Sequence, residues 1–300
     1  MRKKVILGID FNNIFFSSFY GQPLINQHGE NVNAINGFFF RLKIMKEVWN
    51  PDYLFMANDM GRDKTFRRKM YQPYKAHRKA MDPDVINQIK HGYHLTALLG
   101  FPMIGNELYE ADDILGMVSR FATEKDMIMV IASTDKDLYQ LINDNVYIYS
   151  PRRKEVIDLE YMSREYKLTP AQWIEYKMLL GDKSDNVPGV DFVGPATALK
   201  LMQRYHSIDN IYQNLRYLQP QLQDGLLVAK EHLPFARSLI TVLTDYTLID
   251  FNLNMLDNIG RYPREVHEVL DKLGLRALHN VVDNTLLRER REDDEEDYAS

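Results

Sequence analysis

The chain has 300 residues, and its hydrophobic content of 45% is enough for one large core or two smaller ones. It contains no cysteine, which excludes disulfides and thiolate metal sites. No stretch of about 18 consecutive apolar residues occurs, and the amino terminus lacks the pattern of a signal peptide. These features predict a folded, cytoplasmic protein with no membrane partner.

The formal net charge of -5 hides an uneven distribution of charge along the chain. Residues 292–297 are all acidic, so the rest of the chain carries -5 + 6 = +1. We expect residues 287–300 to form an acidic, disordered tail. In contrast, residues 67–79 contain six Lys or Arg, one His and no acid, with Tyr71 and Tyr74 among them. Such a segment is either a solvated basic face or a site that binds phosphate groups.

Short apolar runs separated by helix-length segments predict a mostly parallel, buried sheet in the first half of the chain. The expected strands lie near residues 5–9, 53–57, 101–104, 127–132 and 146–149. Asp82 and Pro83 can begin a helix that ends before Gly100, with Ile86 and Ile89 on one face. The first half of the chain, residues 1–168, is therefore expected to be an α/β domain.

Helical signals replace strand signals at Thr169. Thr169, Pro170 and Gln172 form a capping-box pattern, and Gly181 can end the helix that follows. Further helices are expected near residues 196–205, 212–218, 233–243 and 264–273. We therefore assign residues 169–286 to a second, helical region.

Acidic residues follow three of the predicted strands, at Asp10, Asp59 and Asp135. Because the carboxyl ends of parallel strands meet at the same edge of a sheet, we expect these side chains to lie close together. Neighbouring segments can bring six more acids to this edge: Glu110, Asp112, Asp113, Asp137, Asp182 and Asp185. Each acid taken alone can also be explained as a helix cap or a turn residue.

Nine carboxylates at one edge require charge compensation. One pair about 4 Å apart repels by roughly 4 kcal/mol at an effective dielectric constant near 20. The acids are therefore protonated, farther apart than inferred, or held by divalent cations. A set of oxygen ligands favours two Mg²⁺ ions, or Mn²⁺, over Zn²⁺. Together with a basic segment, this composition is typical of two-metal phosphodiester hydrolysis.

In these motifs the chain resembles the 5′ nuclease family, which includes flap endonucleases, stand-alone bacteriophage 5′ nucleases and the 5′→3′ exonuclease domain of bacterial DNA polymerase I. The matching stretches, in order, are GIDFNNIFFSSFYG, MANDMGRDKTFRRKMYQPYKAHR, YEADDILG, STDKDLYQLI, LLGDKSDNVPGV and LGLRALHN. The resemblance implies a PIN-like (resolvase-like), mostly parallel sheet flanked by helices. It also implies a helical arch at about residues 60–100 and a helix-three-turn-helix that grips duplex DNA. No polymerase domain follows, so the chain resembles the stand-alone form.

The resemblance also implies roles for individual residues. One metal ion is matched by Asp59, Glu110, Asp112, Asp113 and Asp135. The second is matched by Asp137, Asp182 and Asp185, with Asp135 shared and Asp10 among the acids of the rim. Lys75 and Arg78 match cations that contact the scissile phosphate, and Arg67 matches a further basic position near the active site. The expected DNA-binding residues are Arg68, Lys69, Tyr74, Lys79, Gly189, Val190, Gly194 and Thr197.

The helix-three-turn-helix segment departs from the family pattern. Phe192 stands at an expected glycine, Pro195 follows Gly194, and Ala196 stands where a lysine is common. The missing lysine predicts weaker anchoring of duplex DNA. Family members often bind a monovalent cation such as K⁺ through carbonyl groups of this turn, and the departures leave the presence of that ion open.

The interpretation favoured by these motifs is a monomeric, Mg²⁺-dependent, structure-specific 5′ nuclease that acts in the removal of replication primers or flaps. Its expected substrate is DNA with a 5′ single-stranded flap or a 5′ end next to duplex, or an RNA primer–DNA hybrid. One alternative is a non-catalytic protein of the same fold that binds DNA junctions. Another is a phosphatase or phosphotransferase on a related sheet, although the first loop lacks the second aspartate of a DxD signature.

Overall fold

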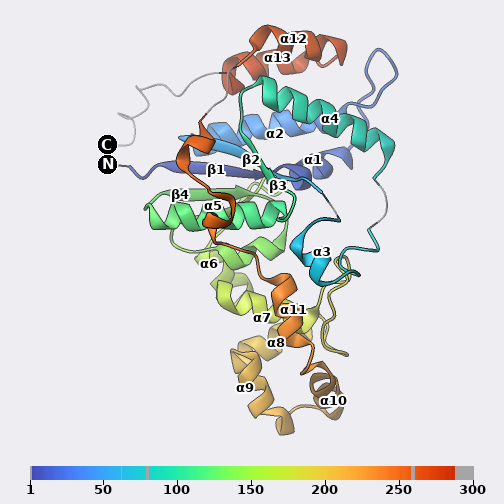
Figure 1. Cartoon of the computed structure of the whole chain (residues 1–300), viewed down its shortest axis with the longest axis vertical. Helices are drawn as coiled ribbons and strands as arrows, with labels where there is room; N and C mark the ends of the chain where they lie inside the picture. Colours follow the sequence, from blue (N-terminus) through green and yellow to red (C-terminus); the bar gives the residue numbers. More distant parts are fainter. Residues whose placement is uncertain (1, 62, 79–80, 258–260, 288–300) are drawn as a thin grey trace.

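The computed structural model of the chain describes residues 2–61, 63–78, 81–257 and 261–287 (Figure 1). Lys79 and residues 288–300 of the expected acidic tail lie outside these ranges. Within the described ranges, no helix is both long enough and apolar enough to cross a membrane.

A mostly parallel sheet forms the centre of the first half of the chain, as predicted, and it has six strands. Its strands are β1 (Val5–Asp10), β2 (Tyr53–Asp59), β3 (Met103–Asn106), β4 (Ile128–Ala132), β5 (Val146–Ser150) and β6 (Glu155–Ile157). The spatial order is β3-β2-β1-β4-β5-β6, and every neighbouring pair is parallel except β5 and β6. The short antiparallel strand β6 had no counterpart in the sequence pattern.

Helices cover both faces of the sheet (Figure 1). Those of the first half are α1 (Phe11–Phe19), α2 (Asn33–Trp49), α3 (Phe66–Met70), α4 (Pro83–Leu98), α5 (Ala111–Glu124) and α6 (Leu159–Tyr161). Along β1, Leu7 and Ile9 pack into a core with α1, α2 and α4, whereas Ile6 belongs to the core that contains α5. This alternation follows from the two-residue period of a strand buried on both faces.

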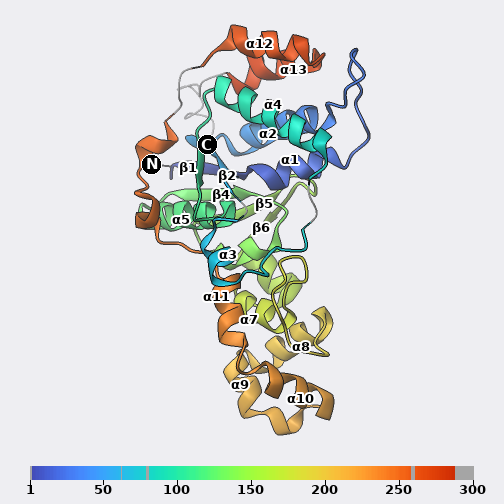
Figure 2. The ribbon, with the colours of Figure 1, turned by 45° about the vertical axis from the view of Figure 1, so that its right-hand side comes forward.

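The second half of the chain is helical, as predicted. It contains α7 (Pro170–Leu180), α8 (Pro195–Tyr205), α9 (Ile208–Gln213), α10 (Pro220–Ala229), α11 (Leu233–Ile240), α12 (Pro263–Lys272) and α13 (Ala277–Val281). The core on the α5 side continues into α7, α8, α10 and α11, so the two halves share apolar contacts. Figures 1 and 2 show α7 to α10 extending away from the sheet.

Two helix expectations were wrong in detail. The helix expected at residues 212–218 begins earlier, at Ile208, because the Ser207 side chain caps it, and only a 3-10 turn follows at Leu215–Tyr217. In α4, the Ile86 side chain is 38% exposed and lies outside the buried face, which is formed instead by residues such as Val85 and Ile89.

The last helices, α12 and α13, pack against α2 and α4 rather than against the other helices of the second half (Figure 1). Their buried residues, among them Val266, Leu270 and Leu278, belong to the core on the α1 and α2 side of the sheet. The chain therefore returns to its first half after α11.

Two glycines allow the end of α7 to contact the turn that precedes α8. Gly181 has a φ of +68°, and a Cβ atom there would lie 2.4 Å from the backbone nitrogen of Gly189. A Cβ atom on Gly189 would lie 2.5 Å from the carbonyl oxygen of Leu180. These contacts hold both ends of the loop that carries Asp182 and Asp185.

We expect Gly189→Ala to lower the free energy of unfolding by about 1–3 kcal/mol, because the added methyl group meets backbone atoms that cannot move aside. Urea unfolding followed by circular dichroism measures the change. Gly61→Ala is the matched control, since a Cβ atom there would meet no other atom within 4 Å and the φ of Gly61 is not left-handed. Equal unfolding midpoints for the two variants would contradict the packing argument.

Candidate active site

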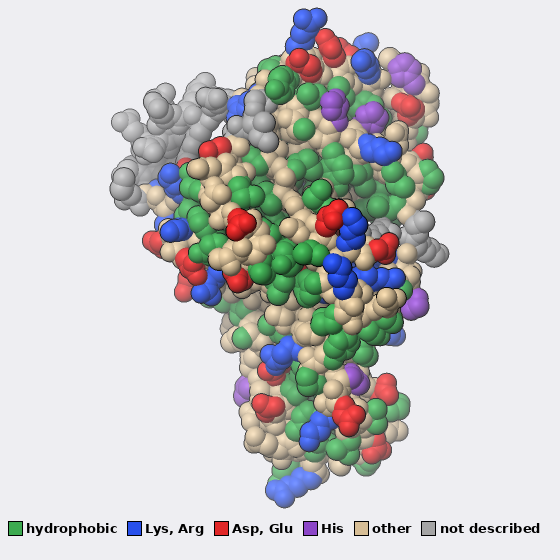
Figure 3. Space-filling model, viewed as in Figure 1, with side chains coloured by type: hydrophobic (Ala, Val, Ile, Leu, Met, Phe, Trp, Pro, Cys, Tyr) green, Lys and Arg blue, Asp and Glu red, His purple; other side chains and the backbone are tan. Residues whose placement is uncertain are grey.

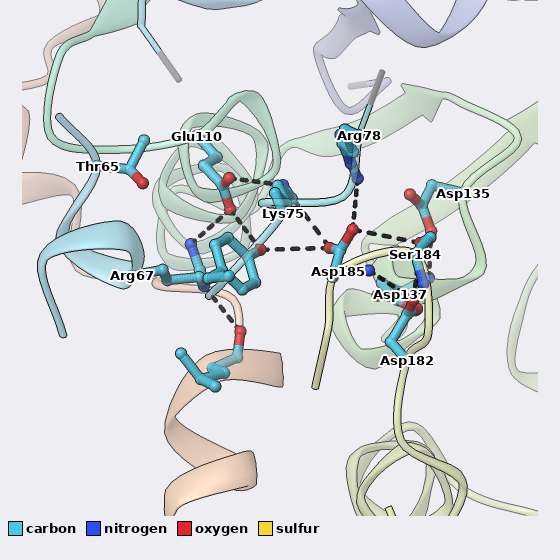
Figure 4. A network of polar contacts seen from close by, with 12 residues as sticks. Thr65, Arg67, Lys75, Arg78, Glu110, Asp135, Asp137, Asp182, Ser184 and Asp185 are labelled. Atoms are coloured by element: carbon cyan, nitrogen blue, oxygen red, sulfur yellow. Dashed lines mark hydrogen bonds and ion pairs between the residues drawn. The ribbon is translucent and has the colours of Figure 1, made fainter. Parts of the chain in front are cut away.

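A pocket lies between the carboxyl edge of the sheet, the basic segment after α3 and the loop between α7 and α8 (Figure 4). Its polar lining consists of Arg67, Tyr74, Lys75, Arg78, Glu110, Asp112, Asp135, Asp137, Asp182 and Asp185. Six carboxylates and three cationic side chains thus line the pocket. The sequence analysis had selected every one of these residues.

The acids reach the pocket from three parts of the fold. Glu110 and Asp112 stand at the start of α5, and Asp135 and Asp137 lie in the segment that follows β4. The carboxylate of Asp135 accepts a hydrogen bond from the backbone nitrogen of Asp137 at 2.8 Å, so it also caps the 3-10 turn Lys136–Leu141. The loop after α7 supplies the remaining acids of the pocket.

Asp10 and Asp59 lie next to the pocket but do not line it. Asp10 is buried at the end of β1 and accepts a hydrogen bond from the Ser133 hydroxyl at 2.8 Å. Asp59, at the end of β2, accepts a hydrogen bond from the backbone nitrogen of Ala111 at 2.8 Å. The structure therefore brings the acids at the ends of β1 and β2, and those after β4, to one edge of the sheet.

The pKa values of three of these carboxyl groups are raised, because the groups are buried close to one another. Burial raises the pKa of Asp10 to about 7, and the charges of Asp59 and Asp135 act in the same direction. Burial and the neighbouring charge of Asp135 also raise the pKa of Asp112 well above its usual range and that of Asp137 to about 6. The ionised forms are therefore disfavoured unless additional positive charge is present.

Cations of the basic segment neutralise one group of acids (Figure 4). The Lys75 ammonium lies 2.5 Å from a carboxylate oxygen of Glu110 and 3.7 Å from one of Asp185. The Arg78 guanidinium lies 2.6 Å from the other carboxylate oxygen of Asp185. The backbone nitrogen of Lys75 also donates to the backbone oxygen of Asp185 at 3.0 Å, which ties the segment to the loop after α7.

A second lysine, which the sequence analysis did not select, neutralises another pair of acids. The Lys177 ammonium lies 2.7 Å from Asp137 and 3.1 Å from Asp182. Although burial opposes it, these two acids raise the pKa of Lys177, so the ammonium stays charged. One sequence feature could have identified Lys177. It lies on α7 one helical turn before Gly181, next to the loop that carries Asp182.

Arg67 forms the most buried ion pair of the site, with its side chain 3% exposed. Its guanidinium donates to both carboxylate oxygens of Asp113, at 2.6 and 2.8 Å, and to Glu110 at 3.1 Å. It also donates to the backbone oxygens of Leu239 and Thr241, each at 2.8 Å. All five N–H donors of the guanidinium are therefore used within the protein.

Asp113 was expected among the metal ligands, but the structure places its carboxylate away from the pocket. Its carboxylate is fully buried, and besides Arg67 it accepts hydrogen bonds from the backbone nitrogens of Glu110, at 3.0 Å, and Leu243, at 2.9 Å. Glu110 and Asp113 complete a capping box at the start of α5. In this arrangement Asp113 anchors α5 and Arg67, and it does not face the pocket.

Two of the residues expected to bind DNA, Tyr74 and Val190, are buried, and a third, Gly189, is partly exposed. Tyr74 is 4% exposed, and its hydroxyl donates to Glu110 at 2.9 Å, so its ring cannot stack on a base. Val190 is buried and its backbone nitrogen donates to Leu179, whereas Gly189 is packed against Gly181. These residues shape the site from within the protein.

Four further residues expected to bind DNA lie at the surface. Arg68 is partly exposed, Lys69 and Gly194 are exposed, and Thr197 is partly exposed. Figure 3 shows Lys and Arg side chains gathered over the region of α3, next to acidic side chains. This basic surface lies beside the pocket, because Lys75 and Arg78 follow it in the chain.

The donor set of the pocket suits hard divalent cations. Its ligands are all carboxylate oxygens, they outnumber the cations, and burial raises the pKa values of several of them. Across the residues that the structure describes, no three acidic or histidine side chains already form a cluster of metal-binding geometry. The Lys75 ammonium contacts both Glu110 and Asp185, and the Lys177 ammonium contacts both Asp137 and Asp182.

Comparison with protein families assigns the chain. Residues 5–167 match the model of the 5′-3′ exonuclease N-terminal resolvase-like domain, and residues 168–260 match that of the 5′-3′ exonuclease C-terminal SAM fold. The chain belongs to the 5′-3′ exonuclease family. The predicted family and fold class are thereby confirmed.

Relatives of two lengths match this family member. It is 32% identical to a 5′-3′ exonuclease of Aquifex aeolicus, over 93% of this chain and 96% of the relative. It is also 32% identical to DNA polymerase I of Bacillus subtilis, over 98% of this chain and 33% of the polymerase. The chain thus spans about a third of the polymerases that it matches.

Solved structures of proteins with low sequence identity to this chain share the fold. T5 5′-exonuclease with bound zinc superimposes with a TM-score of 0.67 at 18% identity, over 93% of this chain and all of that one. The catalytic core of Rad2 in complex with DNA substrate gives a TM-score of 0.59 at 14% identity, over 96% and 93% of the two chains. At these identities the comparison shows the arrangement of the elements alone.

We expect Arg67→Met to lower the free energy of unfolding by about 3–5 kcal/mol, because it leaves the Asp113 and Glu110 carboxylates buried without their cation. Chemical unfolding monitored by tryptophan fluorescence measures this loss. Arg68→Met is the matched control on the same helix, since Arg68 is partly exposed and donates one hydrogen bond, to the Tyr74 carbonyl. Its cost should stay below about 1 kcal/mol. The proposed anchor role fails if both variants unfold at the same denaturant concentration.

Proposed function

We propose that this 5′-3′ exonuclease family member is a structure-specific nuclease that hydrolyses phosphodiester bonds of DNA at 5′ ends and 5′ flaps with two divalent metal ions. The observation that carries the proposal is the pocket itself, in which six carboxylates face the cations Lys75 and Arg78. A protein that only bound DNA would gain repulsion toward phosphate from these acids. Their concentration is useful when the site must hold metal ions.

The metal ions would be held by the carboxylates that the pocket brings together. One group comprises Glu110, Asp112 and Asp135, with Asp10 and Asp59 beside it, and the other comprises Asp137, Asp182 and Asp185. When bound, Mg²⁺ or Mn²⁺ would supply an activated water and stabilise negative charge on the reacting phosphate. We do not extend the ligand set to Asp113, because its oxygens are already occupied by Arg67 and two backbone nitrogens.

The basic residues divide into two kinds of role. Lys75 and Arg78 lie at the mouth of the carboxylate group, where an approaching phosphate would meet them, and they can exchange their carboxylate partners for it. Arg67 has no free N–H donor and is a positioning residue that orients Glu110. Tyr74 helps in this, since its hydroxyl contacts Glu110 at 2.9 Å and Asp185 at 3.3 Å.

The substrate would lie across both halves of the chain. The basic surface around α3 is suited to the 5′ single strand, and the helical half to the adjacent duplex. Solved structures of T5 flap endonuclease and Rad2 include complexes with DNA, which supports this choice of partner. Such a substrate arises in replication, when a primer or a displaced flap has to be removed.

Asp135→Asn should abolish cleavage while leaving DNA binding measurable, because Asp135 is the acid whose charge acts on Asp10, Asp112 and Asp137. The assay uses a 5′-flap duplex labelled at the 3′ end of the flap strand, with Mg²⁺ and with EDTA. Asp144→Asn is the matched control, since Asp144 is exposed and does not line the pocket.

Cleavage near the flap junction that requires Mg²⁺ and disappears in Asp135→Asn, but persists in Asp144→Asn, is the expected result. An Asp135→Asn protein that still cuts would refute the assignment of the site. Salt-sensitive DNA binding without any cleavage by the unmodified protein would instead favour a non-catalytic junction binder.

Lys177→Met should strengthen binding of Mn²⁺ in the absence of DNA, because the Lys177 ammonium competes for Asp137 and Asp182. We expect an increase in affinity of about tenfold for the ion held by Asp137, Asp182 and Asp185, the order expected from removing one nearby positive charge. Electron paramagnetic resonance of free Mn²⁺ measures it directly. Lys183→Met, an exposed lysine in the same loop, is the control. Unchanged Mn²⁺ binding in Lys177→Met would show that the ammonium does not occupy a metal position.

A further inference from the structure

The turn between α7 and α8 exposes a large aromatic side chain in an unfavourable backbone conformation. Phe192 is 71% exposed and has a φ of +64°. The backbone nitrogen of Val193 donates to the carbonyl of Val190 at 3.1 Å, so Phe192 occupies the third position of a β-turn. Glycine is preferred at a turn position with positive φ, and phenylalanine is disfavoured there.

The surroundings hold this turn in place. Val190 and Val193, on either side of the tip, are 5% and 7% exposed and are anchored in the core. A Cβ atom on Gly225 of α10 would lie 2.6 Å from the carbonyl oxygen of Asp191, so α10 packs directly against the turn. The phenyl ring therefore projects from a fixed support and adds little to the core itself.

The position thus carries a cost in backbone conformation without a gain in packing. Strain that the surrounding fold maintains is commonly associated with binding or catalysis. The exposed ring is therefore available to contact a ligand. Under the proposed function, the ligand of this half of the chain is duplex DNA.

We propose that Phe192 is a binding contact that packs on deoxyribose rings of the bound duplex. The inference rests on the proposed function. Base faces inside a duplex are covered by stacking, so the apolar faces of the sugars are what an exposed phenyl ring can reach. The exposed residues that follow, Gly194, Pro195 and Ala196, are uncharged, and Asp191 is exposed on the other side. This composition favours an apolar contact over an ion pair with phosphate.

The contact would compensate for a cation that the turn lacks. Ala196 lies in the first turn of α8 and carries no charge. A lysine there would bind phosphate and release counterions, which makes affinity dependent on salt. An apolar contact contributes equally at low and high salt. We therefore expect this turn to bind duplex DNA with a weak dependence on ionic strength.

The test measures binding of a 5′-flap duplex by fluorescence anisotropy, with Ca²⁺ in place of Mg²⁺, over a range of KCl concentrations. Phe192→Gly should bind about five- to tenfold more weakly at every salt concentration, as expected for the loss of one apolar contact. The slope of the logarithm of affinity against the logarithm of salt should not change. Ala196→Lys should steepen that slope by about one unit.

His206→Gly is the matched control. His206 follows the other end of α8, is exposed, and has a φ of +65°, so glycine relieves the same backbone conformation there. Both glycine variants should unfold at an unchanged or higher urea concentration, and only Phe192→Gly should lose affinity for DNA.

Affinity equal to that of the unmodified protein in Phe192→Gly, or a loss that appears only at low salt, would overturn the proposed contact. A loss of the same size in His206→Gly would also overturn it. Failure of the unmodified protein both to bind and to cut the flap duplex would count against the proposed function instead, so the two failures can be told apart.

Discussion

Repulsion among carboxylates at one edge of the sheet is the constraint on which the rest of this structure depends. Parallel strands bring the residues after β1, β2 and β4 together whatever their charge. The cost is visible in the raised pKa values of Asp10, Asp112 and Asp137. The chain offsets it with cations that come from outside the sheet, namely from the basic segment and from α7.

The sequence could predict the acids because their positions follow from local rules. A buried apolar run that ends in an aspartate is readable without knowledge of tertiary contacts, and so is the capping box at Thr169, which the structure reproduces. Lys177 was not predicted, because no local rule marks it. Its neighbours in sequence are ordinary helix residues, and its meaning comes from Asp137, which lies forty positions earlier in the chain.

Besides contacts between residues that are distant in the sequence, the sequence also left the burial of individual side chains undetermined. Tyr74 lies in a strongly basic stretch, where an aromatic ring suggests contact with bases, yet it is buried against Glu110. Arg67 lies in the same stretch, yet it is sequestered with Asp113. The alternation of inward and outward side chains in a short, irregular segment has no fixed period, so pattern analysis cannot separate the residues that support the site from those that face solvent. The packing of α12 and α13 against the first half of the chain was not predicted either. The pattern of an amphipathic helix shows that one face is buried, but it does not show which surface that face covers.

The segment from Gly181 to Gly194 connects these observations. Its acids meet the cations of the basic segment, and its backbone accepts a hydrogen bond from the nitrogen of Lys75 at 3.0 Å. Asn186 donates to the carbonyl of Pro73 at 3.1 Å, which makes a second tie between the same two segments. Beyond them, the same stretch forms the turn that supports Phe192. Packing of Gly181 against Gly189 fixes the base of this segment. The acids Asp182 and Asp185 and the turn at Phe192 therefore belong to one continuous segment, which is held at the same glycine contact.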